Sequence, residues 1–217
     1  MRLTTAAAVL SASSLTIGVG LGATATELFE PETTSRGFAL HTPESAPEMA
    51  ETFEAIEGSF GFVPNLTAVM AESPALLNAY LSTQQILGEQ GALTPQESNV
   101  VQLTIAKLNG CQYCVNGHGM VGEMMLGQDP GEIKSLRKGS SLGDAKHEAL
   151  RVFTESVHEL RGRVTDAQLD EFYAAGYTRE HALEVIANIA AKVMSNYTNQ
   201  LAETPLDAPI ASYRDSH

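Results

Sequence analysis

Residues 94–118, TPQESNVVQLTIAKLNGCQYCVNGH, decide the expected fold. Thr94 and Glu97 form a capping box with a proline between them at the first helical position. Apolar residues then recur at helical spacing until Asn109-Gly110, a pair that typically ends a helix. A further helix is expected from Cys111 to Leu126, before a glycine and a proline. This stretch therefore predicts two consecutive helices joined by a short turn.

The same helical period continues on both sides of this stretch. Further helices are expected over residues 47–61, 73–90, 132–138, 144–160 and 178–201, with a second capping box at 165–168. No segment shows sustained alternation of apolar and polar residues, and β-branched residues are dispersed. The sequence predicts an all-α fold, a helical bundle.

The expected domain spans residues 47–203. Residues 26–46 contain scattered charges, glycine and proline without a period, which indicates a linker or an arm. Residues 204–217, with two prolines and many polar groups, are expected to be an extended C-terminal tail. At 217 residues with 43% hydrophobic composition, the chain is long enough to bury one sizeable core.

The N-terminal segment differs from the rest in composition. After Arg2 no charged residue occurs until Glu27, and residues 23–25 form a small-x-small cleavage pattern, so residues 1–25 are a possible signal peptide. An exported or periplasmic location is favoured over a cytoplasmic one. A stable membrane span is not expected, because an uninterrupted apolar run of ~20 residues is missing.

The charge of the chain excludes one class of partner. The net charge is -13, so the surface would repel phosphate backbones and anionic lipid head groups. Nucleic acid is therefore not expected as a partner.

The chain has only two cysteines, Cys111 and Cys114, which form a CxxC motif. Such a pair is typical of a redox centre, of half a metal site or of a structural disulfide. Zinc needs a second pair of ligands, which the remaining histidines do not supply. Covalent haem attachment needs histidine directly after the second cysteine, where Val115 stands. Redox chemistry without metal or cofactor is the favoured interpretation.

A histidine follows the cysteines on the same expected helix face. At 100° per residue, Cys111, Cys114 and His118 share one stripe, while Asn116 falls on the opposite, water-facing side. Because His118 lies one turn after Cys114, the imidazole is expected to take the Cys114 proton, although a lone histidine is more often a core residue. Cys114 is then the attacking thiolate, and Cys111 resolves its sulfenic acid by closing a disulfide that an external dithiol reduces.

The string from Leu108 to His118, with Cys-x-x-Cys-x-x-x-His after Asn-Gly, resembles the carboxymuconolactone decarboxylase-like superfamily, specifically its alkylhydroperoxidase D-like, peroxidase-related branch. The resemblance extends over residues 45–203 and includes Gly61–Leu66, Ser73-Pro74 and Asn196–Asn199. It implies an all-α alkylhydroperoxidase D-like bundle, homotrimers or homohexamers, and peroxidase activity without metal or haem. It also implies a lipoyl-type or thioredoxin-like dithiol reductant for the hydroperoxide reaction.

By the same resemblance, Cys114 is peroxidatic, Cys111 is resolving and His118 belongs to the proton relay. One position departs from the pattern. The relay usually includes a glutamate twelve positions before the first cysteine, where this chain has Asn99, whose amide cannot accept the proton. Glu97 is a candidate substitute, with its capping box as the alternative role, and Asn99 is a candidate orienting partner. Slow peroxidase turnover is expected.

Three alternatives stay open. The first is a general thiol-disulfide oxidoreductase, which export would favour because a Cys111–Cys114 disulfide tends to remain oxidised outside the cytosol. The second is a non-enzymatic helical oligomer in which the two cysteines form a structural disulfide. The third is a metal-binding module.

Overall fold

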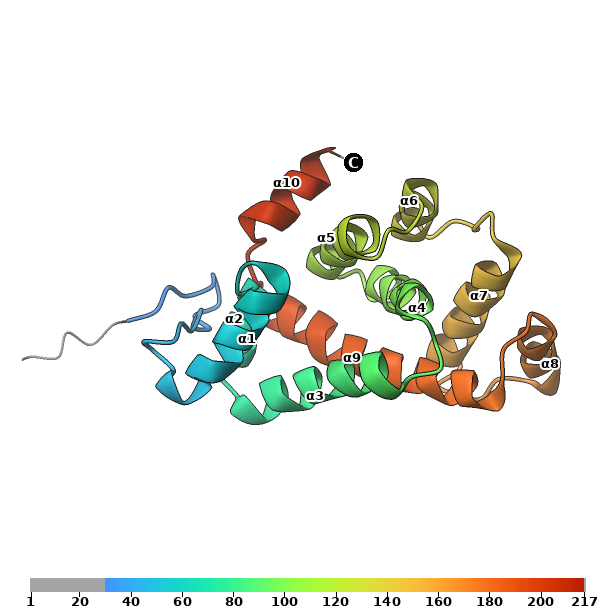
Figure 1. Cartoon of the computed structure of the whole chain (residues 1–217), viewed down its shortest axis with the longest axis horizontal. Coiled ribbons are helices and arrows are strands. Elements are labelled where there is room, and N and C mark those ends of the chain that lie inside the picture. Colours follow the sequence, from blue (N-terminus) through green and yellow to red (C-terminus); the bar gives the residue numbers. More distant parts are fainter. Residues whose placement is uncertain (1–29, 217) are drawn as a thin grey trace, which may run out of the picture.

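The computed structural model describes residues 30–216, and within them it contains helices and no strand (Figure 1). The elements are η1 (Pro47–Met49), α1 (Ala50–Phe60), α2 (Asn65–Met70), α3 (Pro74–Gln90), α4 (Pro95–Leu108), α5 (Gln112–Met120), η2 (Val121–Met125), α6 (Pro130–Lys138), α7 (Ala145–Glu159), α8 (Asp166–Ala174), α9 (Arg179–Ala202) and α10 (Ala208–Ser216). The predicted all-α fold is confirmed. The possible signal peptide, residues 1–25, lies outside the described residues.

Helix α4 lies in the middle of the bundle, between α5 and α9 and beside α7 (Figure 1). Its start is the expected capping box: Thr94 Oγ1 accepts from the Glu97 amide and the Glu97 carboxylate accepts from the Thr94 amide. Every residue from Asn99 to Ala106 is buried, because other helices surround α4. Helix α4 is therefore the part of the core on which α5, α6, α7 and α9 pack.

Helix α9 is the longest helix and runs across the bundle along α3 and α4 (Figure 1). Its buried face is unusually polar, since most of its buried side chains carry a polar or charged group. These buried polar residues are Asn188, Lys192, Ser195, Asn196 and Asn199. Buried polar groups require partners, so this face of α9 marks the region in which a functional site is expected.

An aromatic stack joins α7, α8 and the start of α9. The ring of Phe172 lies 4.0 Å from that of Phe153 and 4.5 Å from that of Tyr177, in both cases nearly parallel. Phe172 is almost completely buried. The stack packs α8 against α7.

The helix expected from Cys111 to Leu126 is divided. Helix α5 ends at Met120 and continues as a π-helical segment, η2, in which each turn is wider. Asn116, expected to face water, is buried because α6 covers that side, and its side chain accepts a hydrogen bond from Arg137. The prediction that polar residues of this helix face water is wrong for Asn116, because α5 contacts neighbouring helices on several faces.

The C-terminal tail, 204–217, was expected to be extended, and this prediction is wrong for Ala208–Ser216, which form α10. Ile210 and Tyr213 lie one turn apart on α10 and are buried against α5. Gly117 and Gly119 allow the close approach, since a Cβ atom on Gly119 would lie 3.0 Å from the Tyr213 ring. Two apolar residues are too few to show a helical period in the sequence. Helix α10 depends instead on its contacts with α5, which the sequence alone does not reveal.

The arm expected at 26–46 is ordered over residues 30–46 and lies against the domain. A single bridge joins Thr33 and Ala39, and Arg36 forms an ion pair of 2.8 Å with Glu203. The backbone amide of His41 donates to the carbonyl of Ala68 in α2, a helix that the sequence did not predict. Within residues 30–216, no helix has the length and apolar character required to cross a membrane.

The aromatic stack predicts a large stability effect at one position. Phe172→Ala should lower the free energy of unfolding by about 3–5 kcal/mol, because it removes a buried ring and leaves a cavity. Denaturant unfolding followed by circular dichroism measures this change. Ile86→Ala is the control, since Ile86 is 54% exposed and its truncation should cost below about 1 kcal/mol. Equal effects of both substitutions would contradict the assigned packing.

Candidate active site

The two cysteines lie at the N-terminus of α5. Cys111 is the N-cap residue, and its sulfur accepts a hydrogen bond of 3.3 Å from the Cys114 amide. The two Sγ atoms are 2.6 Å apart, and both cysteines are free thiols and buried. A helix N-terminus favours negative charge, so both sulfurs occupy a position that stabilises a thiolate.

The surroundings give the two thiols different pKa values. Burial raises the pKa of Cys114, but a hydrogen bond from Cys111, the positive charge of Lys192 and a hydrogen bond from Asn199 outweigh it and lower the pKa to about 6. The hydrogen bond to Cys114 and burial raise the pKa of Cys111. The arrangement thus favours a Cys114 thiolate that accepts a hydrogen bond from the Cys111 thiol.

Helix α9 supplies the further partners of the sulfurs. Asn199 Nδ2 lies 3.2 Å from Cys114 Sγ and 3.9 Å from Cys111 Sγ. Asn199 belongs to the Asn196–Asn199 segment, whose role the sequence did not indicate. An amide N–H directed at a sulfur stabilises its negative charge, so α9 contributes to the acidity of Cys114.

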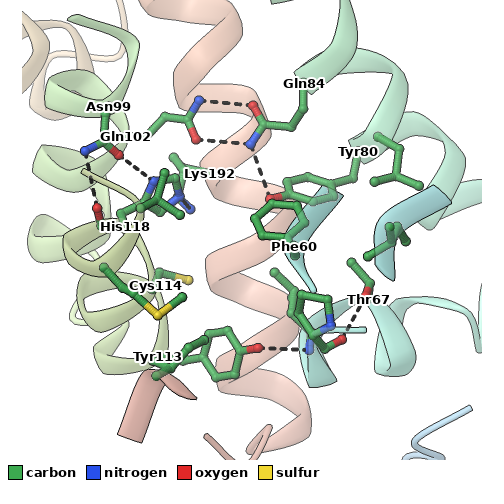
Figure 2. Close-up of a pocket in the computed structure, with 18 of the residues that line it drawn as sticks. Phe60, Thr67, Tyr80, Gln84, Asn99, Gln102, Tyr113, Cys114, His118 and Lys192 are labelled. Atoms are coloured by element: carbon green, nitrogen blue, oxygen red, sulfur yellow. Dashed lines mark hydrogen bonds between the residues drawn. The ribbon is translucent and has the colours of Figure 1, made fainter. Parts of the chain in front are cut away.

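His118 is partly buried and lies between two polar side chains (Figure 2). Its Nδ1 lies 2.8 Å from Asn99 Oδ1, and its Nε2 lies 2.7 Å from Lys192 Nζ. Burial and the charge of Lys192 hold the pKa of His118 well below its usual range, so the imidazole is neutral. Asn99 therefore lies in direct contact with His118, and its orienting role stays a prediction.

The direct contact between His118 and Cys114 that the helical spacing predicted is not present. Among the hydrogen bonds of residues 30–216, none joins the imidazole to the Cys114 sulfur, because Nε2 faces Lys192 instead. The expectation assumed a pair within one helix. It omitted Lys192, which reaches the site from a helix 74 residues further along the chain.

An apolar cavity of about 400 Å³ lies beside Cys114, and His118, Asn99 and Lys192 also line it (Figure 2). Aromatic rings form much of its lining. They include Phe60, Phe62, Tyr80 and Tyr113. Cys111 does not line the cavity and lies behind Cys114 as seen from it. A ligand in the cavity therefore meets the more acidic of the two thiols.

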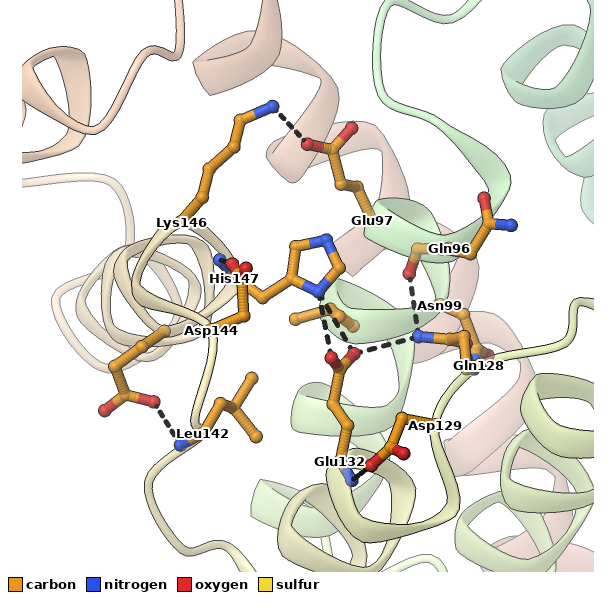
Figure 3. A network of polar contacts seen from close by, with 12 residues as sticks. Gln96, Glu97, Asn99, Gln128, Asp129, Glu132, Leu142, Asp144, Lys146 and His147 are labelled. Atoms are coloured by element: carbon orange, nitrogen blue, oxygen red, sulfur yellow. Dashed lines mark hydrogen bonds and ion pairs between the residues drawn. The ribbon is translucent and has the colours of Figure 1, made fainter.

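A series of side-chain amides leads from Asn99, the partner of His118, to Glu132 (Figure 3). Asn99 Nδ2 donates to Gln128 Oε1 at 2.6 Å, and Gln128 Nε2 donates to Glu132 at 3.1 Å. Gly122, in η2, makes this approach possible, since a Cβ atom there would lie 2.7 Å from Asn99 Nδ2. The amides thereby fix the orientation of Asn99, with its oxygen toward His118.

Glu97, the candidate substitute for the relay glutamate, lies outside this cluster (Figure 3). Its carboxylate accepts from the Thr94 amide in the capping box and forms an ion pair of 2.8 Å with Lys146 of α7. Burial would raise its pKa, but the hydrogen bonds from Lys146 and Thr94 outweigh it and lower the pKa to about 2. The structure therefore joins Asn99 to the cysteine site and leaves Glu97 with a capping and ion-pair role.

No candidate metal site occurs among the described side chains. Residues 30–216 contain no cluster of three or more histidine, cysteine or carboxylate groups arranged to hold a metal ion.

Comparison with known families assigns the central part of the chain. The model of the family described as "Carboxymuconolactone decarboxylase family" matches residues 74–155, from α3 to α7. The segment includes both cysteines and His118. This central segment is carboxymuconolactone decarboxylase-like. The resemblance recognised in the sequence is thus confirmed.

Solved structures share the fold of this chain. An uncharacterized peroxidase-related protein from Ralstonia eutropha, described as an alkylhydroperoxidase AhpD core, has a TM-score of 0.74 and 19% identity over 82% of this chain and 95% of its own. A peroxidase-related protein from Silicibacter sp. has a TM-score of 0.71 and 19% identity over 84% and 97%. The debrominase Bmp8, in complex with 2,3,4-tribromopyrrole, has a TM-score of 0.70 and 16% identity over 85% and 99%. No curated protein sequence matches the chain.

The placement of Glu97 predicts that a neutral substitute affects acid stability and not thiol chemistry. The folded-state pKa of about 2 lies below the ordinary value of 4.5 for a glutamate side chain. Its ionised form therefore contributes stability above pH 4.5, and this contribution is lost as the pH falls toward 2. Glu97→Gln retains the capping box and should remove this part of the pH dependence, as measured by thermal unfolding between these pH values.

The rate of Cys114 alkylation should be the same in Glu97→Gln and in the unsubstituted protein. Lys146→Met is the matched variant, because it removes the partner of Glu97 and should also reduce stability in this pH range. A large loss of Cys114 reactivity in Glu97→Gln would contradict the placement of Glu97 outside the reactive cluster.

Proposed function

We propose that this protein is a thiol-dependent peroxidase that reduces hydroperoxides with Cys114 and Cys111, with His118 in the polar network that serves proton transfer. One observation supports this most strongly. Cys114, the thiol with the lowered pKa, lines an apolar cavity, and Cys111 lies 2.6 Å behind it. A nucleophile that meets the substrate and a second thiol that meets only the nucleophile are the two groups that a dithiol peroxidase needs.

The first step is attack of the Cys114 thiolate on the terminal oxygen of the hydroperoxide. A sulfur–oxygen bond forms and the oxygen–oxygen bond breaks, so that sulfur loses two electrons and becomes a sulfenic acid. The other peroxide oxygen leaves with the electron pair and takes up one proton as the alcohol. Water is largely excluded from the buried sulfur, so this proton must come from the surrounding side chains.

In the second step the Cys111 sulfur attacks Cys114, closes the disulfide and releases water, which takes the Cys111 proton. The short distance between the sulfurs supports this step. A dithiol reductant of lipoyl or thioredoxin-like type then returns two electrons and two protons to the cysteines. No metal or cofactor takes part in this proposed cycle.

The fold and the cavity support a small apolar substrate. The structural relatives include proteins described as peroxidase-related and a debrominase that holds a brominated pyrrole, so the fold accommodates different reactions at low identity. The aromatic wall of the cavity favours an organic hydroperoxide over a polar one. General thiol-disulfide exchange is the second candidate, favoured by the two adjacent thiols and disfavoured by their burial.

We further propose that the protein is a homo-oligomer, a trimer or a hexamer. The outer side of α9 carries large apolar side chains at helical spacing, among them Leu183, Ile186, Tyr197 and Leu201, and each is at least half exposed. Exposed apolar surface of this kind is typical of interfaces between subunits. Export of the chain, expected from residues 1–25, stays a prediction.

Stopped-flow oxidation of the reduced protein tests the proposed cycle. Cys114→Ser should abolish hydroperoxide-dependent oxidation, because the nucleophile is lost. Cys111→Ser should retain the first fast step and accumulate a sulfenic acid, because no resolving thiol remains. Mass spectrometry after trapping of the sulfenic acid measures both outcomes.

The pair of variants also separates the candidate functions. Rapid reaction with disulfides and slow reaction with every hydroperoxide would favour the thiol-disulfide oxidoreductase. Equal hydroperoxide reduction by Cys114→Ser and the unsubstituted protein would exclude the peroxidase cycle proposed here.

A further inference from the structure

Lys192 is a charged side chain in the centre of the bundle. It is 1% exposed, and within residues 30–216 no carboxylate lies at ion-pair distance from its Nζ. Its ammonium group faces His118 Nε2 at 2.7 Å and lines the cavity beside Cys114 (Figure 2). A buried cation without an anion is costly, so an anion is expected close to it.

The Cys114 thiolate is the group in this cluster that can supply the negative charge. The charge of Lys192 lowers the pKa of Cys114, and to a smaller extent that of Cys111. Neither His118 nor Asn99 bears negative charge. The Lys192 ammonium and the Cys114 thiolate therefore compensate each other inside the protein.

The amide series determines which nitrogen of His118 carries its proton. The Glu132 carboxylate accepts from Gln128 Nε2, so the oxygen of Gln128 faces Asn99 and accepts from its Nδ2. The oxygen of Asn99 is consequently left to accept from His118 Nδ1. His118 Nε2 then has a free lone pair, which accepts a hydrogen bond from Lys192.

This tautomer assigns different roles to His118 and Lys192. With Nε2 occupied by Lys192, the imidazole is an acceptor that holds the ammonium in place, and it is not the base that deprotonates Cys114. A carboxylate in place of Asn99 would favour a charged imidazole directly beside the Lys192 ammonium. The neutral Asn99 avoids this repulsion, which gives a physical reason for its presence at a position where the family pattern has glutamate.

We propose that Lys192 is a catalytic residue of this site: its ammonium holds Cys114 as the thiolate and gives a proton to the oxygen that leaves the hydroperoxide. The proposal rests on the proposed peroxidase function. The oxygen–oxygen bond breaks as the sulfur–oxygen bond forms, the leaving oxygen takes the Lys192 proton and departs as the alcohol, and Lys192 becomes a neutral amine. When the dithiol reductant regenerates the thiols, the Cys114 proton returns to Lys192.

The first test measures the ionisation of Cys114 without any peroxide. In a Cys111→Ser background, which leaves one thiol and retains a hydrogen-bond donor, the rate of alkylation by iodoacetamide is followed against pH. The inflection should lie well below the ordinary thiol value with Lys192 present, since the pKa of Cys114 is lowered to about 6 in the unsubstituted protein. In Lys192→Met, which retains an apolar stem of similar length, it should move toward the ordinary thiol value of ~8.5, so that alkylation at neutral pH slows by up to about 30-fold.

His118→Gln is the matched control, because an amide oxygen can still accept a hydrogen bond from Lys192. Its inflection should stay close to that of the background protein. An inflection that rises in His118→Gln and stays unchanged in Lys192→Met would overturn the proposal and identify His118 as the base. Since alkylation involves no hydroperoxide, this result holds whether or not the protein is a peroxidase.

The second test addresses proton donation. At a pH at which Cys114 is ionised in both proteins, alkylation rates should be equal, while hydroperoxide oxidation of Lys192→Met should remain about 10²-fold slower, as expected for loss of a general acid. Ethylammonium should restore part of this rate in Lys192→Ala, because the amine fits the space vacated by the side chain. Equal oxidation rates in the presence and absence of Lys192 would exclude the acid role, and circular dichroism verifies that each variant is folded.

Discussion

A positive charge buried in the middle of a helical bundle requires a partner, and this requirement organises the site. The ammonium of Lys192 comes from α9, the imidazole of His118 from α5 and the amide of Asn99 from α4. Each of these helices is packed by apolar contacts, but the orientation of their polar side chains is determined by hydrogen bonds in a region from which water is largely absent. Three of the helices that contribute to the core therefore also form the site.

The acidity of Cys114 results from opposing effects. Burial disfavours the thiolate, whereas the hydrogen bonds from Cys111 and Asn199, together with the charge of Lys192, favour it. The favourable contributions come from two helices, so the thiolate depends on the packing of α5 against α9. A cysteine exposed at a helix N-terminus would be stabilised as a thiolate by the helix dipole but not by a buried lysine. A buried cysteine without these partners would be a protonated, inert thiol.

Much of the fold follows from local sequence. The capping boxes at Thr94 and Thr165 mark the starts of α4 and α8 because capping involves residues three positions apart. The cysteines and His118 are recognisable for the same reason, since their spacing is local. Lys192 and Gln128 were not predicted, because their contacts with the site depend on the packing of separate helices. A lysine within an apolar helical period, at a position expected to face the core, is the signal that would have indicated Lys192.

The sequence predicted the local structure of two parts of the chain wrongly, and in both parts this structure depends on contacts with other helices. Helix α10 forms where Ile210 can pack against α5, and the π-helical segment η2 lies where Gly122 meets Asn99 and Gln128. The sequence left both Glu97 and Asn99 as candidate partners of the cysteine site, and neighbouring helices distinguish them. Both residues face the interior of the bundle from α4. Helix α7 presents Lys146 to Glu97, while α5 presents His118 to Asn99.

The central claim is that the surroundings make Cys114, and not Cys111, the reactive thiolate. Brief alkylation of the reduced, unsubstituted protein at neutral pH, followed by mass spectrometry that distinguishes the two cysteines, tests it most directly. The account predicts that Cys114 is modified first, while Cys111 remains a thiol. Preferential modification of Cys111, or equal modification of both residues, would contradict it.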